Sequence, residues 1–163
     1  MKTKVLILLA LSSLTLCAQD KPTLAQYGPV APALYETAMR AAWTNFQSGE
    51  YETAITNAET CIAAFGQGAN QIQSVREKEK TIFPVGKVSK ADKERITRDQ
   101  ILHDVATCFL IKGWAEEKLG HKEEARKAYT EARKYPLARS SMPTGESFWS
   151  PAEKASESLA KLQ

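Results

Sequence analysis

The residues of this chain that could carry catalysis are its histidines, cysteines and paired carboxylates, and their spacing predicts no active site. The two histidines are His103 and His121. His103 is followed directly by Asp104, but neighbouring residues of a helix point to different faces, so the two side chains cannot act as a pair. No serine or cysteine stands in a recognisable nucleophile motif. The carboxylate pairs, which are typical of a solvated helix surface, are Glu116 with Glu117 and Glu123 with Glu124. We therefore expect no enzymatic activity.

Metal, cofactor and nucleic-acid sites are also not predicted. The sequence has no Cys/His spacing typical of zinc, no acidic calcium loop and no glycine-rich phosphate loop. The chain has 22 basic and 19 acidic residues and a net charge of +3, which falls to +1 without Lys2 and Lys4. A nearly neutral chain offers no electrostatic surface for nucleic acid or anionic lipid. The lysine-rich stretch 87–98 is interrupted by Asp92 and Glu94 and is typical of a solvated helix face.

The N-terminus predicts export. Two lysines precede an uncharged run over residues 5–16, and Cys17-Ala18 follows. A basic segment, an apolar segment and a small-residue site are the three parts of a signal peptide. The run spans about 18 Å as a helix, too little for a bilayer core of about 30 Å. Cleavage after Ala18 would release residues 19–163 to the periplasm or the medium. Alternatively, residues 14–17 resemble a bacterial lipobox, although Leu16 stands where that pattern has a small residue. If Cys17 carries a lipid, the protein would be anchored to the membrane through it.

A repeated pattern dominates the remaining chain. Residues 43–62 align with residues 114–133 at an offset of 71, so that Trp43 matches Trp114 and Gly49 matches Gly120. Each copy predicts a helix, a short glycine turn and a second helix, because glycine readily adopts the left-handed conformation that ends many helices. The small residues Ala54 and Ala125 also align, at the point where antiparallel helices must approach closely.

The two copies resemble the tetratricopeptide repeat (TPR), as found in small exported bacterial proteins. The second copy carries the family pattern in Gly113, Trp114, Leu119, Gly120, Ala125, Tyr129, Ala132 and Pro136. The first copy matches at Gly49, Tyr51, Ala54, Ile55 and Ala58, but Cys61 replaces an alanine and no proline closes it. The resemblance implies an all-α domain over residues 19–163 with two TPR-like helical hairpins, at about 34–66 and 101–136. An insertion at 67–100 separates them, and a loop and capping helix follow at 137–163.

Local signals predict the helices outside the repeats. Glycines at 66 and 68 are expected to end the first hairpin, and residues 82–86 and 138–149 are expected to be loops. Ser89 with Asp92 predicts a capping box, followed by a helix that continues into the second repeat. Ser150, Pro151 and Glu153 predict the start of the C-terminal helix.

The TPR resemblance also implies a binding groove, because the first helix of each hairpin lines the concave face in that family. The implied groove positions are Glu36, Met39, Trp43, Phe46 and Gln47 in the first copy, and Thr107, Leu110, Trp114, Glu117 and Lys118 in the second. Large aromatic side chains are common anchors of recognition. The alternative is that both tryptophans are core residues. Phe148 and Trp149 form a second candidate patch, which we expect to be exposed.

Cys61 and Cys108 lie on helices that consecutive hairpins would pack together. Export would permit a disulfide between them, and the alternative is two buried thiols that behave as small apolar side chains.

We expect the protein to be an exported, non-catalytic adaptor for an unidentified protein or peptide. Two alternatives remain open: a structural or lipid-anchored accessory subunit of a cell-envelope assembly, and an accessory to carbohydrate processing whose tryptophans stack on sugar rings.

Overall fold

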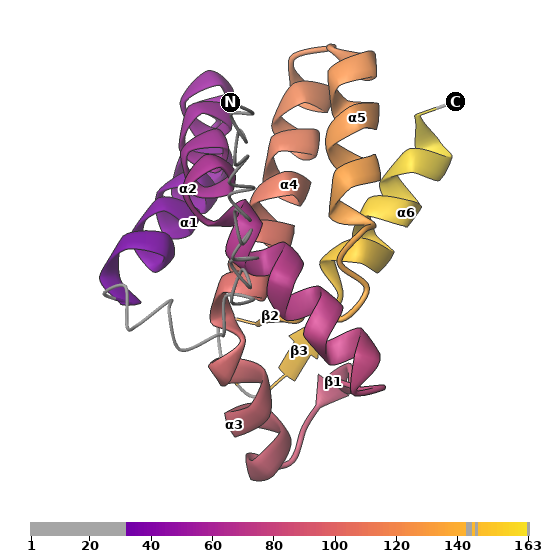
Figure 1. The fold of residues 1–163 in the computed structure, drawn as a ribbon. Coiled ribbons are helices and arrows are strands. Elements are labelled where there is room, and N and C mark those ends of the chain that lie inside the picture. Colours follow the sequence, from indigo (N-terminus) through magenta and orange to yellow (C-terminus); the bar gives the residue numbers. More distant parts are fainter. Residues whose placement is uncertain (1–31, 143–144, 146, 163) are drawn as a thin grey trace, which may run out of the picture.

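The computed structural model describes residues 32–142, 145 and 147–162, with side chains from Thr37 onward. Over these residues the protein is mostly helical, with 72% helix, and has six helices packed against each other beside a small three-stranded antiparallel sheet (Figure 1). The predicted signal peptide, Cys17 and the side chain of Glu36 lie outside the described part. The expectation of a helical protein is confirmed, whereas the sheet was not predicted.

The helices form two hairpins and two further elements. They are α1 (Pro32–Gln47), α2 (Tyr51–Lys78), α3 (Lys90–Arg98), α4 (Gln100–Lys118), α5 (Lys122–Ala132) and α6 (Pro151–Lys161). Gly49, with φ of 80°, turns the chain between α1 and α2, and Gly120, with φ of 84°, does so between α4 and α5. Helix α4 packs against α2 on one side and α5 on the other, and α6 covers α5 and part of α4.

Small residues allow the helices of each hairpin to approach closely. Ala54 and Ala58 of α2 are buried in the first hairpin, and Ala125 of α5 is buried in the second. Gly113 of α4 lies directly against the ring of Tyr129 on α5, with no room for a side chain between them. The core therefore depends on close backbone approach as well as on burial of large apolar side chains.

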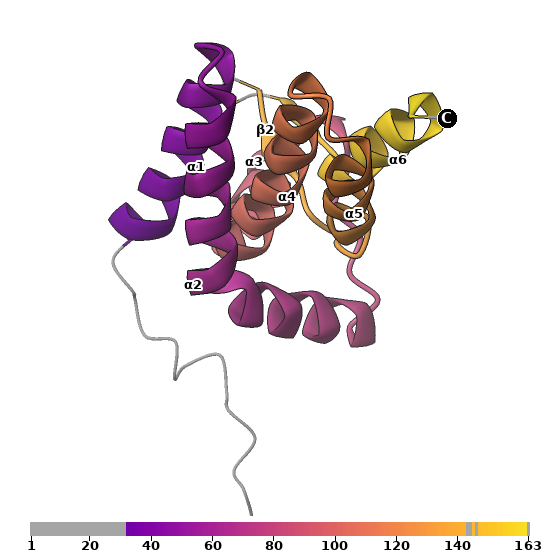
Figure 2. The same ribbon diagram turned by 90° about the horizontal axis from the view of Figure 1, so that it is seen from above.

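The predicted end of the first hairpin near residues 66–68 is wrong. Helix α2 continues without interruption to Lys78, and Figure 2 shows it changing direction sharply near its middle. Ala69 and Ile72 are buried beyond the two glycines, and a Cβ built on Gly68 would lie 3.6 Å from Ile101 of α4. Packing of this second half outweighs the cost of about 1 kcal/mol for each helical glycine, and glycines are common where helices bend.

The predicted continuous helix from residue 90 into the second repeat is also wrong, because the chain breaks at Asp99. Helix α3 ends at Arg98 and α4 begins at Gln100. The buried carboxylate of Asp99 accepts two hydrogen bonds from Arg76 of α2, at 2.6 Å from Nε and 2.9 Å from Nη2. This ion pair connects the junction to the end of α2, a contact that local sequence does not reveal.

Both predicted helix starts are confirmed by their caps. The Ser89 hydroxyl accepts a hydrogen bond from the backbone N–H of Asp92 at 3.1 Å. The Ser150 hydroxyl accepts one from the N–H of Glu153 at 3.3 Å, and Pro151 is the first helical residue of α6. These contacts satisfy N–H groups that would otherwise lack a partner at the helix start.

A three-stranded sheet includes parts of the loops predicted at 82–86 and 138–149. Residues 82–85 are outside helices and strands, as predicted, and only Gly86 of that loop belongs to a strand. The strands are β1 (Gly86–Lys87), β2 (Ser140–Ser141) and β3 (Ser147–Trp149), in the order β1-β3-β2. Phe148 of β3 pairs with Gly86 on one side and Ser141 on the other. Buried Arg139 connects this region to the body, since its Nε and Nη2 donate to the Phe83 carbonyl at 2.9 and 2.6 Å.

Candidate binding site

The two predicted groove tryptophans lie next to each other in the structure. Trp43 of α1 and Trp114 of α4 lie with ring centroids 6.0 Å apart, and Phe46 of α1 stacks on Trp114 at 5.8 Å. All three side chains are partly buried and pack against the hydrophobic core while keeping some exposed surface. The first helices of the two hairpins thus contribute to one continuous aromatic cluster.

The predicted second patch divides into one residue that joins this cluster and one that does not. The Trp149 ring stacks on Trp114 with a centroid distance of 6.5 Å. Phe148 is only 6% exposed and packs with Phe83 and Ile96, so its prediction as an exposed residue is wrong. Successive side chains of a strand point to opposite faces, which explains why these neighbours in β3 have different surroundings.

Further residues extend the cluster beyond the sequence prediction. The ring of Tyr51, at the start of α2, lies 5.8 Å from Phe46. The indole Nε1 of Trp114 donates a hydrogen bond to the Ser158 hydroxyl of α6 at 3.2 Å. The aromatic site is defined here as Trp43, Phe46, Tyr51, Trp114 and Trp149. It draws on α1, α2, α4 and β3, and α6 fixes the orientation of its central ring.

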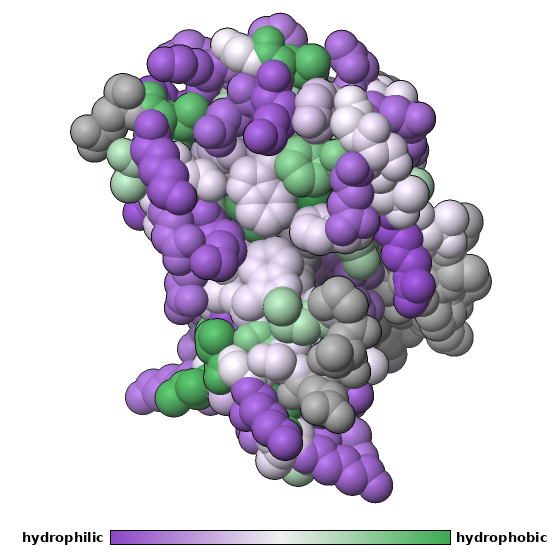
Figure 3. Space-filling view, turned by 180° about the vertical axis from the view of Figure 1, so that it is seen from behind, coloured by the Kyte–Doolittle hydropathy of each residue, from purple (hydrophilic) through white to green (hydrophobic). Residues whose placement is uncertain are grey.

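Polar side chains border the aromatic site. Gln47 follows Phe46 on α1, Glu117 and Lys118 lie about one turn after Trp114 on α4, and all three are exposed. Glu117 accepts a hydrogen bond from the Tyr129 hydroxyl at 2.6 Å. Burial, and secondarily this bond, raises the pKa of Tyr129, so the phenol stays protonated and acts as a donor. Figure 3 shows pale and green side chains uncovered in the middle of one face, with purple side chains at its margins.

Three other implied groove positions have different surroundings. Leu110 is fully buried among residues of α5 and α6, so the structure does not support it as a groove residue. Thr107 is also buried, and its hydroxyl bonds to the His103 carbonyl and to Ser140. Met39 is partly buried on α1 against the core.

The two histidines differ in their surroundings. His103 is 1% exposed; its Nε2 donates to the Ile96 carbonyl at 2.8 Å and its Nδ1 accepts from the Arg139 N–H at 3.0 Å. Burial lowers the pKa of His103 to about 4, so the ring is neutral near pH 7. His121 is exposed and lies 2.9 Å from a Glu116 carboxylate oxygen. Over the described residues, no cluster of His, Cys, Asp or Glu could hold a metal ion.

The two cysteines of the described region are buried free thiols in contact with each other. Cys61 belongs to α2 and Cys108 to α4, and both are fully buried. Burial, and then a hydrogen bond with the Cys61 side chain, raises the pKa of the Cys108 thiol. The structure therefore brings together the two residues that the sequence analysis paired, in their reduced form.

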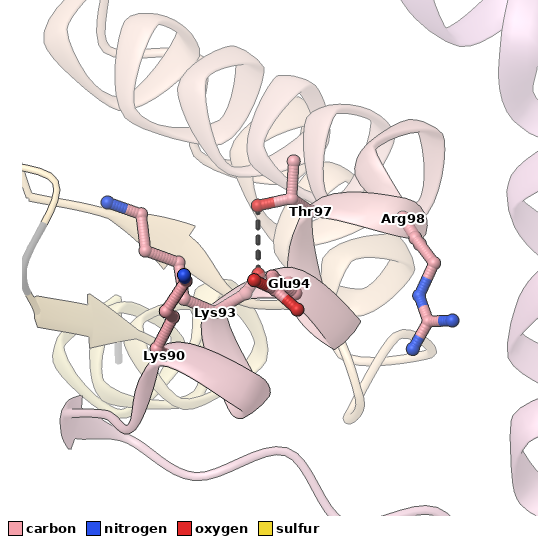
Figure 4. A pocket seen from close by; sticks show the side chains of 5 residues that line it. All are labelled: Lys90, Lys93, Glu94, Thr97 and Arg98. Atoms are coloured by element: carbon pink, nitrogen blue, oxygen red, sulfur yellow. Dashed lines mark hydrogen bonds between the residues drawn. The ribbon is translucent and has the colours of Figure 1, made fainter.

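A shallow hollow of about 690 Å³ on α3 has no counterpart among the predicted site residues. All of its lining residues belong to that one helix: Lys90, Lys93, Glu94, Thr97 and Arg98. Figure 4 shows Lys90 and Lys93 extending to one side of α3 and Arg98 to the other. Because the cations do not converge, this hollow is not a pocket for a single small anion.

Comparison with known proteins gives no relative: no family model, curated protein or solved structure matches the chain. None of the helices in the described ranges combines the length and apolar character that crossing a membrane requires.

Proposed function

We propose that this protein is an exported TPR-like adaptor that binds a protein or peptide at the aromatic site. Two features support the family assignment. The hairpins α1/α2 and α4/α5 both turn at a glycine with positive φ, at aligned positions of the two sequence copies. The close contact of Gly113 with Tyr129 agrees with the need for a small residue at that repeat position.

The observation that carries the functional proposal is the aromatic site itself. Five aromatic residues from four elements each have a ring centroid within 6.5 Å of a neighbouring ring and remain partly exposed. Burial stabilises the folded state most when such rings are buried completely, since each buried ring removes a large apolar area from water. Partly exposed aromatic clusters with a polar rim are typical of the anchor regions of protein interfaces.

The ring geometry favours a peptide or protein ligand over a sugar. Trp114 already has Phe46 and Trp149 stacked on it, both at an interplanar angle of 29°. Two rings of the protein therefore already stack on Trp114, whereas sugar stacking requires an open aromatic face. Edges of rings and the gaps between them suit apolar side chains of a partner, and Gln47, Glu117 and Lys118 can bond to its backbone.

Site-specific photo-crosslinking in the native cells tests this proposal. A photoreactive amino acid replaces Gln47 or Lys118, which are exposed rim residues without a hydrogen bond to preserve. Matched control proteins carry it at Ser74 and Arg133, exposed positions of α2 and the end of α5. We expect one protein partner to be crosslinked from the rim positions and not from the controls.

A second variant connects the crosslink to the rings. Trp43→Ala should abolish crosslinking from Lys118 while the circular dichroism spectrum and melting cooperativity remain those of a folded protein. Equal crosslinking from all four positions would contradict the groove proposal. No crosslink at any of them would favour the structural-subunit alternative.

A further inference from the structure

Positive charge is concentrated in one part of this otherwise balanced protein, so the nearly neutral net charge, which by itself predicts no surface for anionic lipid, conceals a local basic one. Residues 80–98, called the basic tip below, contain six basic and two acidic residues, against 22 and 19 in the whole chain. The rest of the chain is therefore close to neutral. The basic residues of the tip are Lys80, Lys87, Lys90, Lys93, Arg95 and Arg98. The tip includes α3 and β1, which lie at one extremity of the molecule (Figure 1).

Most of these cations face solvent without an acidic partner. Among the described residues, Lys87, Lys90, Lys93 and Arg98 are exposed and form no ion pair. Arg95 instead lies over the Phe83 ring at 5.5 Å and pairs with Asp92. The inward side of α3 is thus internally satisfied, and its outward side carries unpaired positive charge, interrupted only by exposed Glu94.

The same tip exposes apolar side chains on a fixed backbone. Ile82 is 79% exposed and Val85 is 48% exposed, although both precede a strand of the sheet. Arg95 donates a hydrogen bond to the Ile82 carbonyl at 3.1 Å, and Arg139 donates two to the carbonyl of buried Phe83. The loop is therefore held against the body while the Ile82 side chain points outward. An isoleucine this exposed buries little apolar area on folding, so Ile82 and Val85 place apolar surface beside the exposed cations.

We propose that the basic tip docks on the surface of a bilayer that contains anionic phospholipid. Lysines near such a surface each contribute about 1 kcal/mol to binding, and Ile82 and Val85 would enter the headgroup region. The tip is an end of the molecule rather than a groove, and its charged side chains diverge (Figure 4). Cations that diverge at one end of the molecule fit a planar array of phosphates better than they fit one small anion.

Vesicle binding of the full exported protein tests this inference. The protein is recovered after export as the Cys17→Ser variant, so that no lipid can attach, and its mass confirms removal of the signal peptide. Vesicles of phosphatidylcholine alone are compared with vesicles that also contain phosphatidylglycerol. We expect binding only to the anionic vesicles, with an affinity that falls as salt is added.

Charge and apolar variants localise the contact. Lys90→Gln/Lys93→Gln should lower the partition coefficient about 30-fold, because each lysine accounts for a factor of about five. A control, Lys122→Gln/Lys161→Gln, removes the same charge from exposed positions of α5 and α6 and should lower it much less. Ile82→Ser should weaken binding without changing its salt dependence.

Three results would overturn the inference: no binding to anionic vesicles, equal binding to neutral vesicles, or equal loss in the tip variant and its control. Retention on immobilised polyglutamate without vesicle binding would assign the tip to an acidic protein instead. The inference does not depend on the proposed adaptor function, because none of these measurements involves the aromatic site.

Discussion

Replacement of Gly113 by alanine tests the closest helix contact in the structure. A Cβ built on Gly113 lies 3.0 Å from Cζ of Tyr129 and closer still to Cδ1 and Cε1. Carbon atoms normally pack at about 3.5–4.0 Å, so the ring or the helix must move by roughly 1 Å. Tyr129 is fully buried and its hydroxyl donates to Glu117, so the ring cannot move without loss of packing or of that bond.

The expected loss of stability is the sum of two destabilising effects and one stabilising effect. Overpacking costs about 1–3 kcal/mol, and a contact this short belongs at the upper end. Weakening of the Tyr129–Glu117 hydrogen bond adds about 1 kcal/mol. Alanine is a better helix former than glycine by about 1 kcal/mol, which offsets part of the loss. We expect Gly113→Ala to lower the free energy of unfolding by about 3 kcal/mol and Tm by about 10 °C.

Urea and thermal unfolding, followed by circular dichroism, measure this change. The matched control is Gly66→Ala, since Gly66 is also helical but has no atom within 4 Å of a built Cβ. That control should leave stability unchanged or raise it by up to about 1 kcal/mol. In a Tyr129→Ala background, Gly113→Ala should no longer destabilise, because the clashing ring is gone. Equal stability of Gly113→Ala and the unmodified protein would refute the packing geometry described here.

Three further predictions concern buried polar groups. Burial lowers the pKa of His103 to about 4 in the folded protein, so the unfolded chain binds more protons between about pH 4 and 6.5. The free energy of unfolding should therefore be highest above pH 6.5 and should fall by about 3 kcal/mol as the pH decreases to 4. His103→Gln should remove this pH dependence, which urea titrations at several pH values measure. Cys61 and Cys108 should form a disulfide in the protein recovered after export. The protein would then be lighter by two hydrogen atoms in intact mass and more stable than its reduced form by up to about 4 kcal/mol, and recovery of free thiols only would contradict the bridge. Asp99→Asn should cost about 2–3 kcal/mol, measured from the urea midpoint, because it removes the charge that pairs with Arg76.

The parts of the fold that the sequence predicts correctly are governed by local chemistry. Gly49 and Gly120 mark the two hairpin turns because their positive φ disfavours other residues. Ser89 and Ser150 mark helix starts because a short hydroxyl side chain can bond to an N–H three residues later. Each of these signals acts within a few residues and needs no knowledge of the rest of the chain.

The errors all involve contacts between distant segments. Helix α2 continues past Gly68 because its second half packs on α4, and the helix break at Asp99 coincides with a bond to Arg76, 23 residues earlier. The strands are two or three residues long, too short for an alternating pattern, and they depend on Arg139 reaching the Phe83 carbonyl. A single sequence carries no signal for such pairings.

The candidate site shows the same division. Trp43 and Trp114 were found because they align between the repeats. Trp149 was expected in a separate patch, since only the sheet brings it to Trp114. The repeat alignment places Leu110 in the groove, because the TPR resemblance implies that the first helix of each hairpin lines it. However, α4 packs against α2, α5 and α6. The spacing of apolar residues along this helix therefore does not distinguish groove positions from core positions.

The aromatic site and the basic tip have no residue in common, which makes their proposed roles separable. Trp43→Ala should leave binding to anionic vesicles unchanged, and Lys90→Gln/Lys93→Gln should leave crosslinking from Lys118 unchanged. Substitutions at distant positions without shared partners normally have additive effects. The sheet connects the two surfaces through backbone pairing, since β3 carries Trp149 and pairs with β1 at Gly86. If vesicles alter the crosslink yield, Gly86→Ala should abolish that effect, because the φ of 85° at this position disfavours a side chain and the substitution therefore disturbs β1. An effect that persists in this variant would place the coupling outside the sheet.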